Sequence, residues 1–169
     1  MKKIIEVPHY AQYIDVDDDF WQSRSCGIVS LGMILDYYGI EVPIAELIKK
    51  GKELGGYIKN VGWKHDSIVD LARIYGFKCN RTEEEKIENL LKSIEKDEPV
   101  IISIHKKFNT NNGGHLAVLT GYYYNEKDNE LIGVYINDPI GFPYKFKNQF
   151  VKIETFMQGW KKRAIYIKK

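Results

Sequence analysis

The stretch of sequence that decides the fold is CGIVSLGMILDYYG, residues 26–39. Its apolar residues recur every three or four positions, which is the spacing of one helix face. Ser25 precedes the stretch as a suitable N-cap, and Gly39 follows it as a suitable C-terminal cap. The sequence therefore predicts a largely apolar, buried helix over residues 26–38, with Cys26 as its first residue.

The segments around this helix divide into a helical first half and a strand-rich second half. Before the helix, residues 3–7 are expected to form a strand and residues 12–25 a polar loop. The other expected helices lie at 43–54, 66–75, 82–96 and 148–158, and the other expected strands at 77–81, 99–105, 115–124, 131–137 and 163–168. This order predicts an α+β fold, in which an N-terminal helical half packs on a mostly antiparallel C-terminal sheet. The length fits a single domain over residues 1–169, with a cleft between its halves.

The composition excludes several classes of protein. The 25 basic and 23 acidic residues leave a net charge of +2, too even to indicate binding to nucleic acid or to an anionic membrane. No apolar run approaches the roughly 18–20 residues that span a bilayer, and the N-terminus lacks the apolar core of a signal peptide. We therefore expect a cytoplasmic protein with reduced thiols, while the sequence does not indicate an oligomeric state.

Metal and cofactor sites are not expected either. The two cysteines and four histidines show no ligand spacing such as CxxC or HExxH, and no glycine-rich phosphate loop is present. The acidic run DVDDD, residues 15–19, lacks the glycine and the distal glutamate of an EF-hand loop. We interpret that run as a solvated acidic loop.

Cys26 is the first candidate for chemistry because it begins a helix. The unpaired backbone N–H groups and the positive end of the helix dipole favour a thiolate there, with a pKa well below ~8.5. Gly27 allows a substrate to approach the backbone closely. Cys79, by contrast, lies inside a short strand-like run and is expected to be a buried, inert cysteine.

A thiol nucleophile needs a base, and the base needs an orienting group. Of the four histidines, His115 is best placed, because it follows Gly114 at the start of an apolar strand, where its ring can face a cleft. Asp138 ends the strand that a hairpin pairs with the strand of His115, so the two residues are expected to be cross-strand neighbours, with a Cβ separation of roughly 5 Å if they lie directly opposite each other. Asn137 should point to the opposite face and is the alternative orienting group.

The oxyanion that forms during attack on a carbonyl also needs hydrogen-bond donors. The backbone N–H of Cys26 is one candidate. A side-chain amide is the usual second donor, and Gln12 and Gln22 both lie upstream of the cysteine. Their distance along the sequence does not decide between them.

These pieces together resemble the papain-like cysteine peptidases, and in particular a bacterial family related to the double-glycine (bacteriocin-leader) peptidases. The segments that carry the resemblance are VPHYAQ at 7–12, CGIVSLGMILDYYG at 26–39, GGHLAVLTGYY at 113–123 and VYINDP at 134–139. The resemblance implies a papain-like fold. It also implies that Gln12 is an oxyanion donor, Cys26 the nucleophile, His115 the base and Asp138 the orienting group.

The function that these residues predict is hydrolysis of peptide bonds in a peptide or protein substrate, through a Cys-His-Asp triad and a thioester acyl-enzyme. The expected substrate-binding residues beside the triad are Gly27, Gly114 and Gln22. Two other functions fit the same residues. One is a papain-like module that binds peptides or regulates without turnover, and the other is an amidase or acyltransferase that uses the same triad.

Overall fold

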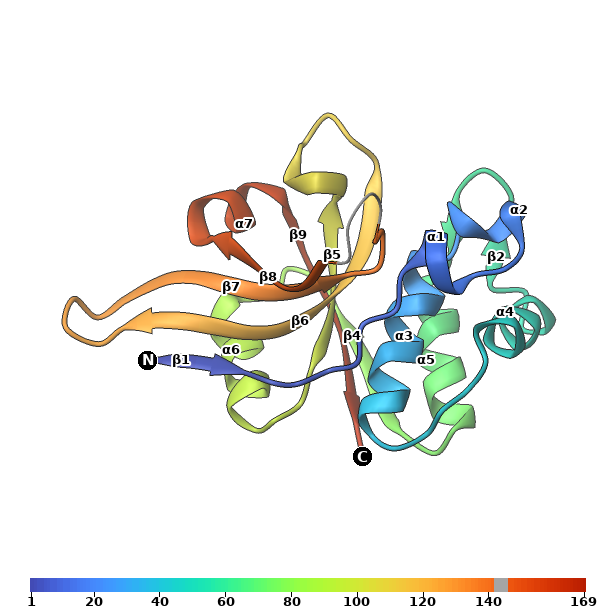
Figure 1. Ribbon diagram of the computed structural model, residues 1–169, viewed down its shortest axis with the longest axis horizontal. Helices are drawn as coiled ribbons and strands as arrows, with labels where there is room; N and C mark the ends of the chain where they lie inside the picture. Colours follow the sequence, from blue (N-terminus) through green and yellow to red (C-terminus); the bar gives the residue numbers. More distant parts are fainter. Residues whose placement is uncertain (142–145) are drawn as a thin grey trace.

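A computed structural model of the protein describes residues 1–141 and 146–169, and it has a helical part beside a sheet (Figure 1). The helical part comes from the first half of the chain. Its elements are α1 (Gln12–Asp15), α2 (Asp19–Gln22), α3 (Cys26–Tyr37), α4 (Ile44–Glu53), α5 (His65–Ile74) and the small ribbon of β2 (Tyr57–Ile58) and β3 (Gly62–Trp63).

The sheet comes mainly from the second half of the chain, and all its strand pairs in the described residues are antiparallel. Its strands are β1 (Lys2–Ile4), β4 (Lys78–Thr82), β5 (Val100–His105), β6 (Gly114–Asn125), β7 (Glu130–Asp138), β8 (Phe146–Lys152) and β9 (Trp160–Lys168). They run in the order β4-β9-β5-β6-β7-β8, with β1 paired to the second half of β6. Helices α6 (Ile87–Glu95) and α7 (Ile153–Gly159) and the short 3-10 helix η1 (Lys106–Phe108) pack beside the sheet.

The core lies where α3 packs against β6. Residues 27–35 of α3 are buried, as its apolar sequence predicts, and buried aliphatic residues of β5 and β6 belong to the same cluster. Because α3 and β6 form this contact, the first residue of α3 lies at the boundary between the helical part and the sheet. The predicted α+β arrangement, with the helical half on a mostly antiparallel sheet, is confirmed.

The start of α3 differs from the prediction in one detail that bears on the site. Ser25 occupies the N-cap position, but its hydroxyl donates to the Trp21 carbonyl at 2.7 Å and does not cap the helix. The first amides of α3 therefore have no side-chain acceptor from Ser25, and they remain available to a group at the helix tip.

Other predicted elements are corrected by tertiary pairing. Residues 12–25, expected to be a loop, contain the short helices α1 and α2. The helix expected at 148–158 is the end of β8 followed by α7, because pairing with β7 holds residues 146–152 extended. The helix expected at 82–96 begins only at Ile87, and the ribbon of β2 and β3 was not predicted.

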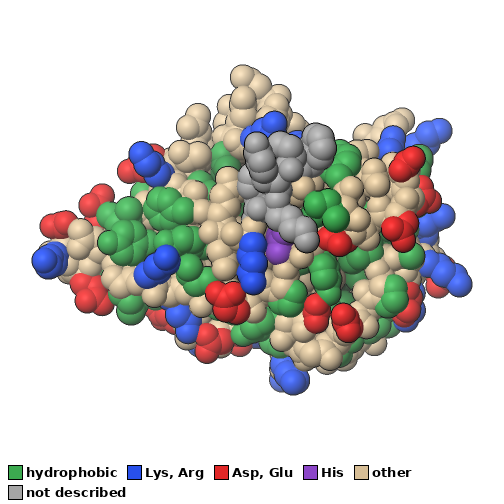
Figure 2. Space-filling view, viewed as in Figure 1, with side chains coloured by type: hydrophobic (Ala, Val, Ile, Leu, Met, Phe, Trp, Pro, Cys, Tyr) green, Lys and Arg blue, Asp and Glu red, His purple; other side chains and the backbone are tan. Residues whose placement is uncertain are grey.

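The surface agrees with the even charge of the chain. Figure 2 shows basic and acidic side chains interspersed over the face seen in Figure 1, with apolar side chains between them. In the part of the chain that the structure describes, no helix is long and apolar enough to cross a membrane.

Candidate active site

Cys26 lies half-buried at the tip of α3, where the helical part meets the sheet. Its sulfur accepts hydrogen bonds from two backbone amides, those of Gly27 in α3 and Leu116 in β6. It also hydrogen-bonds with the side chain of His115. One backbone donor thus comes from each part of the molecule, and the sulfur is fixed at their boundary.

His115 is the second residue of β6 and is only 6% exposed. Its Nε2 lies 2.7 Å from Oδ1 of Asp138, the last residue of β7, which is 8% exposed. Since Asp138 occupies Nε2, Nδ1 is the ring nitrogen left to face Cys26. A second bond, from the Ile140 N–H to Asp138 Oδ1 at 2.9 Å, holds the carboxylate in place.

The strand register shows how this cross-strand pair is offset along β6 and β7. Asn137 lies opposite Val118, so Asp138 falls level with Ala117, two residues beyond His115. Two residues along a strand return to the same face, so His115 and Asp138 are diagonal neighbours on one face. The long imidazole side chain spans the diagonal. The two residues are thus cross-strand neighbours but do not lie directly opposite each other.

The pKa values of these groups move in directions that favour charge separation. Burial alone raises the pKa of the Cys26 thiol, but the hydrogen bond and charge of His115, with the two backbone amides, lower it below its ordinary value. Burial alone lowers the pKa of His115, but its bonds to Asp138 and Cys26 raise it to about 10. Burial alone raises the pKa of Asp138, but the bond and charge of His115, together with the Ile140 N–H and the charge of His9, lower it below its ordinary value. All three shifts act in the direction of a thiolate–imidazolium pair held by a carboxylate.

Asn137, the alternative orienting group, instead holds two backbone segments in place. Its side chain is fully buried, its Nδ2 donates to the Val7 carbonyl at 3.0 Å, and its Oδ1 accepts from the Asn148 N–H at 2.8 Å. Both ends of the amide are thus used to hold the backbone, on the face opposite to Asp138. The structure does not bring Asn137 to His115.

Residues 5–12, which we call the N-terminal strap, cross from the sheet to the helical part and are tied to the residues around Asp138. The ties are Ile5 N–H to the Thr120 carbonyl (2.7 Å), Asn137 to Val7, His9 Nε2 to the Asp138 carbonyl (2.7 Å) and Gln12 N–H to the Pro139 carbonyl (2.6 Å). The sequence analysis predicted no role for His9. The only indication of one was that His9 lies inside the segment VPHYAQ. In the structure it supports the backbone of Asp138.

The strap also distinguishes the two candidate glutamines. The side chain of Gln12 is buried, and its Nε2 donates to the Gln22 carbonyl at 2.8 Å, four residues before Cys26. Gln12 thereby connects the Cys26 segment with the Asp138 turn. The Nε2 of Gln22 instead donates to the Val16 carbonyl at 2.9 Å. Neither side chain is among those that line the cleft beside Cys26.

A cleft of about 580 Å³ opens beside Cys26 and His115. Gly27 and Gly114 both line it. A Cβ on Gly27 would lie 2.9 Å from Leu116 Cδ1, so a larger residue there would push on the packing under the sulfur. The other walls include residues that were not predicted: Tyr57 and residues 60–63 of the β2–β3 ribbon, His65, Ser103, and Lys161 and Arg163 of β9.

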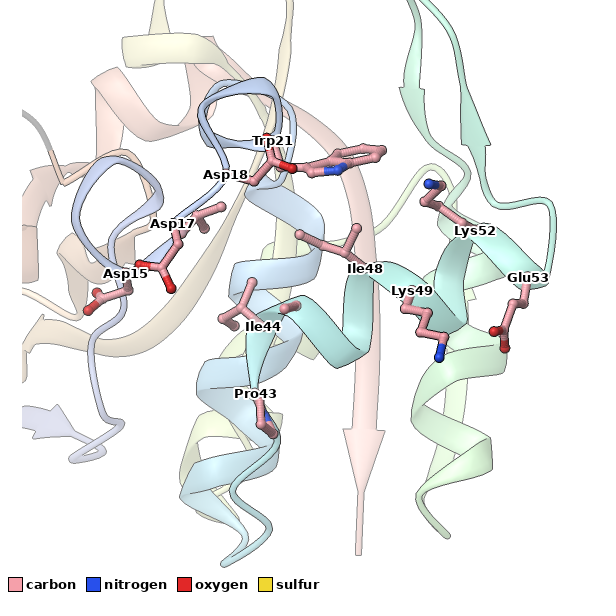
Figure 3. A pocket seen from close by; sticks show the side chains of 12 residues that line it. Asp15, Asp17, Asp18, Trp21, Pro43, Ile44, Ile48, Lys49, Lys52 and Glu53 are labelled. Carbon is pink, nitrogen blue, oxygen red and sulfur yellow. The ribbon is translucent and has the colours of Figure 1, made fainter.

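A larger hollow, of about 630 Å³, lies away from this site, between α4 and the segment from Asp15 to Trp21. Figure 3 shows Ile44 and Ile48 of α4 in it, with Asp15, Asp17 and Asp18 on one side and Lys49 and Lys52 on the other. The described residues that line it include no cysteine or histidine. Its size does not make it the site of thiol chemistry.

Comparison with known proteins now connects this geometry to a family. A profile of the Peptidase C39 like family matches residues 4–165, which is nearly the whole chain. The chain belongs to the Peptidase C39-like family. No curated protein matches the chain significantly. As a Peptidase C39-like protein it is a cysteine-type peptidase, and the resemblance inferred from the sequence motifs is confirmed.

Solved structures agree on the fold of this C39-like chain. A Bacillus anthracis protein described as a C39-like peptidase is 25% identical, with a TM-score of 0.72 over 100% of this chain and 98% of that one. Two others show the same fold. A double-glycine motif protease from an AMS/PCAT transporter, in complex with its leader peptide, is 21% identical (TM-score 0.67; 98% of this chain, 94% of that one). The peptidase domain of Streptococcus ComA is 22% identical (TM-score 0.66; 86% and 92%).

Proposed function

We propose that this C39-like chain hydrolyses peptide bonds with a Cys-His-Asp triad made of Cys26, His115 and Asp138. The observation that carries the proposal is the chain of contacts from the Cys26 sulfur to His115 and, through Nε2, to Asp138 at 2.7 Å. A nucleophile, a base and an orienting group in hydrogen-bond sequence are what thiol-dependent acyl transfer requires. We also propose that residues 1–169 act as a single domain.

In the proposed reaction the Cys26 thiolate attacks the carbonyl carbon of the scissile amide and forms a C–S bond. The carbonyl oxygen becomes an oxyanion, for which we propose the Cys26 backbone N–H and the Gln12 side-chain amide as donors. Gln12 is preferred to Gln22 because Gln12 contacts both the segment before Cys26 and the turn after Asp138. The C–N bond then breaks, and the His115 imidazolium gives its proton to the leaving amine.

The second half of the reaction releases the acyl group. Water attacks the thioester carbon while neutral His115 takes a proton from it, and the C–S bond breaks. The products are a carboxylic acid and the restored thiolate–imidazolium pair. Asp138 holds the His115 Nε2–H through both steps, so that Nδ1 faces the reacting atoms in each of them.

We propose a peptide as the substrate, because a leader peptide is bound by one of the similarly folded proteases and because the cleft beside Cys26 is open. We also propose the cytoplasm as the location. The reducing conditions there would keep Cys26, which has no disulfide partner, as a thiol.

The proposal is tested by replacing each cysteine in turn and incubating the protein with a proteome-derived peptide library. We expect Cys26→Ala to abolish cleavage, measured by mass spectrometry of new termini, and Cys79→Ala to retain it. In the unaltered protein at pH ~6, iodoacetamide should label Cys26 at least about 10³-fold faster than Cys79. Cleavage by the Cys26→Ala variant, or equally slow labelling of both thiols, would show that the proposed nucleophile is wrong.

A further inference from the structure

The cleft beside Cys26 is lined by basic side chains from both parts of the molecule. Arg24 and His65 belong to the helical part, and Lys161 and Arg163 belong to β9. None of the described residues that line this cleft is acidic. The even net charge of the chain therefore conceals a strongly one-sided distribution at the proposed active site.

Lys161 lies beside Gly114, the residue that precedes His115. Its side chain is half-buried, and its Nζ lies 3.0 Å from the point that a Cβ on Gly114 would occupy. Gly114 directly precedes His115, so the missing side chain of this glycine leaves the space beside His115 that the ammonium occupies. In the described residues no carboxylate forms an ion pair with Lys161, and residues 142–145 contain no acidic residue.

Arg163 completes the sheet wall of the same cleft. It pairs with Ser103 of β5, which in turn pairs with Leu116 of β6, so these three residues form a row across the sheet. No ion pair joins Arg163 to a carboxylate in the part of the chain that the structure describes. Arg81, one of the nearest other cations to His65, differs in this respect, because it pairs with Asp66 and Glu83 on the surface.

The charges of these groups act on a shared space. The pKa of His65 is lowered by burial and then by the positive charges of Arg163, Arg81 and Lys161. A half-enclosed cleft strengthens such effects relative to open solvent, and it would strengthen the attraction of an anion equally. The Lys161 ammonium and the Arg163 guanidinium have no carboxylate partner among the described residues. A negatively charged group of a ligand can therefore pair with them.

We infer that Lys161 and Arg163 bind a carboxylate of the substrate peptide beside Cys26, so that the cleft selects peptides with an acidic side chain or a free C-terminus at that position. The inference rests on the proposed function and specifies its substrate class. Carboxylates accept charge-assisted hydrogen bonds from both groups, and the planar guanidinium can bind one with two parallel bonds. Gly114 contributes because its missing side chain leaves room for the Lys161 ammonium.

The first test measures the electrostatics of the cleft without any turnover. Iodoacetate and iodoacetamide alkylate the same Cys26 sulfur, but only iodoacetate carries a carboxylate. We expect Lys161→Met and Arg163→Gln each to lower the ratio of the iodoacetate rate to the iodoacetamide rate by about fivefold, the effect of one partly exposed charge pair. The iodoacetamide rate alone should change little, which shows that the thiolate is intact.

Lys162 supplies the matched control. It is exposed, lies between the two residues on β9, and is not among the residues that line the cleft. Lys162→Met removes the same charge from the chain and should leave the rate ratio unchanged. An unchanged ratio in Lys161→Met and Arg163→Gln, or an equal drop in Lys162→Met, would overturn the inference.

The second test identifies the source of the carboxylate. Peptides that the unaltered protein cleaves in the library are resynthesised with Glu or Gln, and with a free or amidated C-terminus. We expect one of these carboxylates to raise kcat/KM by about tenfold, and the double variant of Lys161 and Arg163 to lose that preference.

The outcomes separate the two proposals. Cleavage with no preference for either carboxylate would overturn the inference and leave the proposed function standing. Absence of cleavage together with slow iodoacetamide labelling of Cys26 would instead remove the proposed function. In either case, the ratio of the iodoacetate rate to the iodoacetamide rate from the first test shows whether Lys161 and Arg163 attract a carboxylate to Cys26.

Discussion

Cys26 and Cys79 place the same side chain in two environments of one molecule. Cys79 is 7% exposed on β4, and burial raises the pKa of its thiol to about 12, with only a partly opposing effect from Arg73. Cys26 is also desolvated, yet two amides and an imidazole lower the pKa of its thiol. The difference shows that burial alone makes a cysteine inert, and that donors arranged around the sulfur reverse the effect.

The largest expected effect comes from removing the imidazole, which should make the surroundings of Cys26 more like those of Cys79. In His115→Gln the sulfur keeps the Gly27 and Leu116 amides but loses its hydrogen bond and charge partner. We expect iodoacetamide labelling of Cys26 at pH ~6 to slow by about 10²-fold.

The labelling rate of Cys79 in the same sample is the internal control, because Cys79 is far from the substitution in the fold and should not respond. If Cys26 reacts as fast in His115→Gln as in the unaltered protein, the helix tip alone lowers the pKa of the thiol. The difference between the thiol pKa values of Cys26 and Cys79 would then come from the helix dipole and the backbone amides.

An effect of middle size concerns stability against pH. The pKa of His115 in the folded protein is about 10, above its ordinary 6.5. Its stabilising contribution is therefore complete below pH ~6.5 and is lost as the pH rises toward 10. In Cys26→Ala the thiol no longer titrates and no longer raises the pKa of His115, so only the Asp138 part of the shift remains. We expect the free energy of unfolding of this variant to fall by about 2 kcal/mol as the pH rises above ~6.5.

Chemical denaturation at several pH values measures this fall, and the double variant Cys26→Ala, His115→Gln is the reference. Lysine and tyrosine titrations affect both proteins alike, so only the difference between the two curves is interpreted. Parallel curves would mean that Asp138 does not hold a charged imidazole in the folded state.

The smallest effect should come from Cys79 itself. Cys79→Ala removes a buried sulfur from the core, and we expect the free energy of unfolding to fall by about 1 kcal/mol with kcat/KM unchanged. Denaturation and peptide cleavage on one preparation give both quantities. A loss of activity without a loss of stability would mean that the second thiol has a chemical role, and it would remove the contrast between the two cysteines.

The sequence predicted the parts of this molecule whose residues carry strong local signals. The apolar spacing of α3 and its first residue Cys26 were predictable, as were the strand ends at His115 and Asp138. The register between β6 and β7 was not, because the two irregularities in their pairing depend on packing and not on a turn residue.

The walls of the cleft were also beyond sequence reasoning. Each strand of the β2–β3 ribbon is only two residues long, which is too short for an alternating pattern of apolar and polar residues. Lys161 and Arg163 look like an ordinary basic run before a strand. Their importance arises from the pairing of β9 with β5, which brings them beside residues some 60 positions earlier in the chain, and only tertiary structure reveals that.

The N-terminal strap has a consequence for how this chain tolerates change. Its ties are spaced along one short stretch, and three of the four that were described use the backbone of the strap itself, at Ile5, Val7 and Gln12. A substitution in the strap would remove at most the His9 tie, whereas inserting or deleting a single residue between Val7 and Gln12 would shift the downstream ties out of step together. The length of this stretch, more than the identity of its side chains, is what any redesign or circular rearrangement of the protein must preserve.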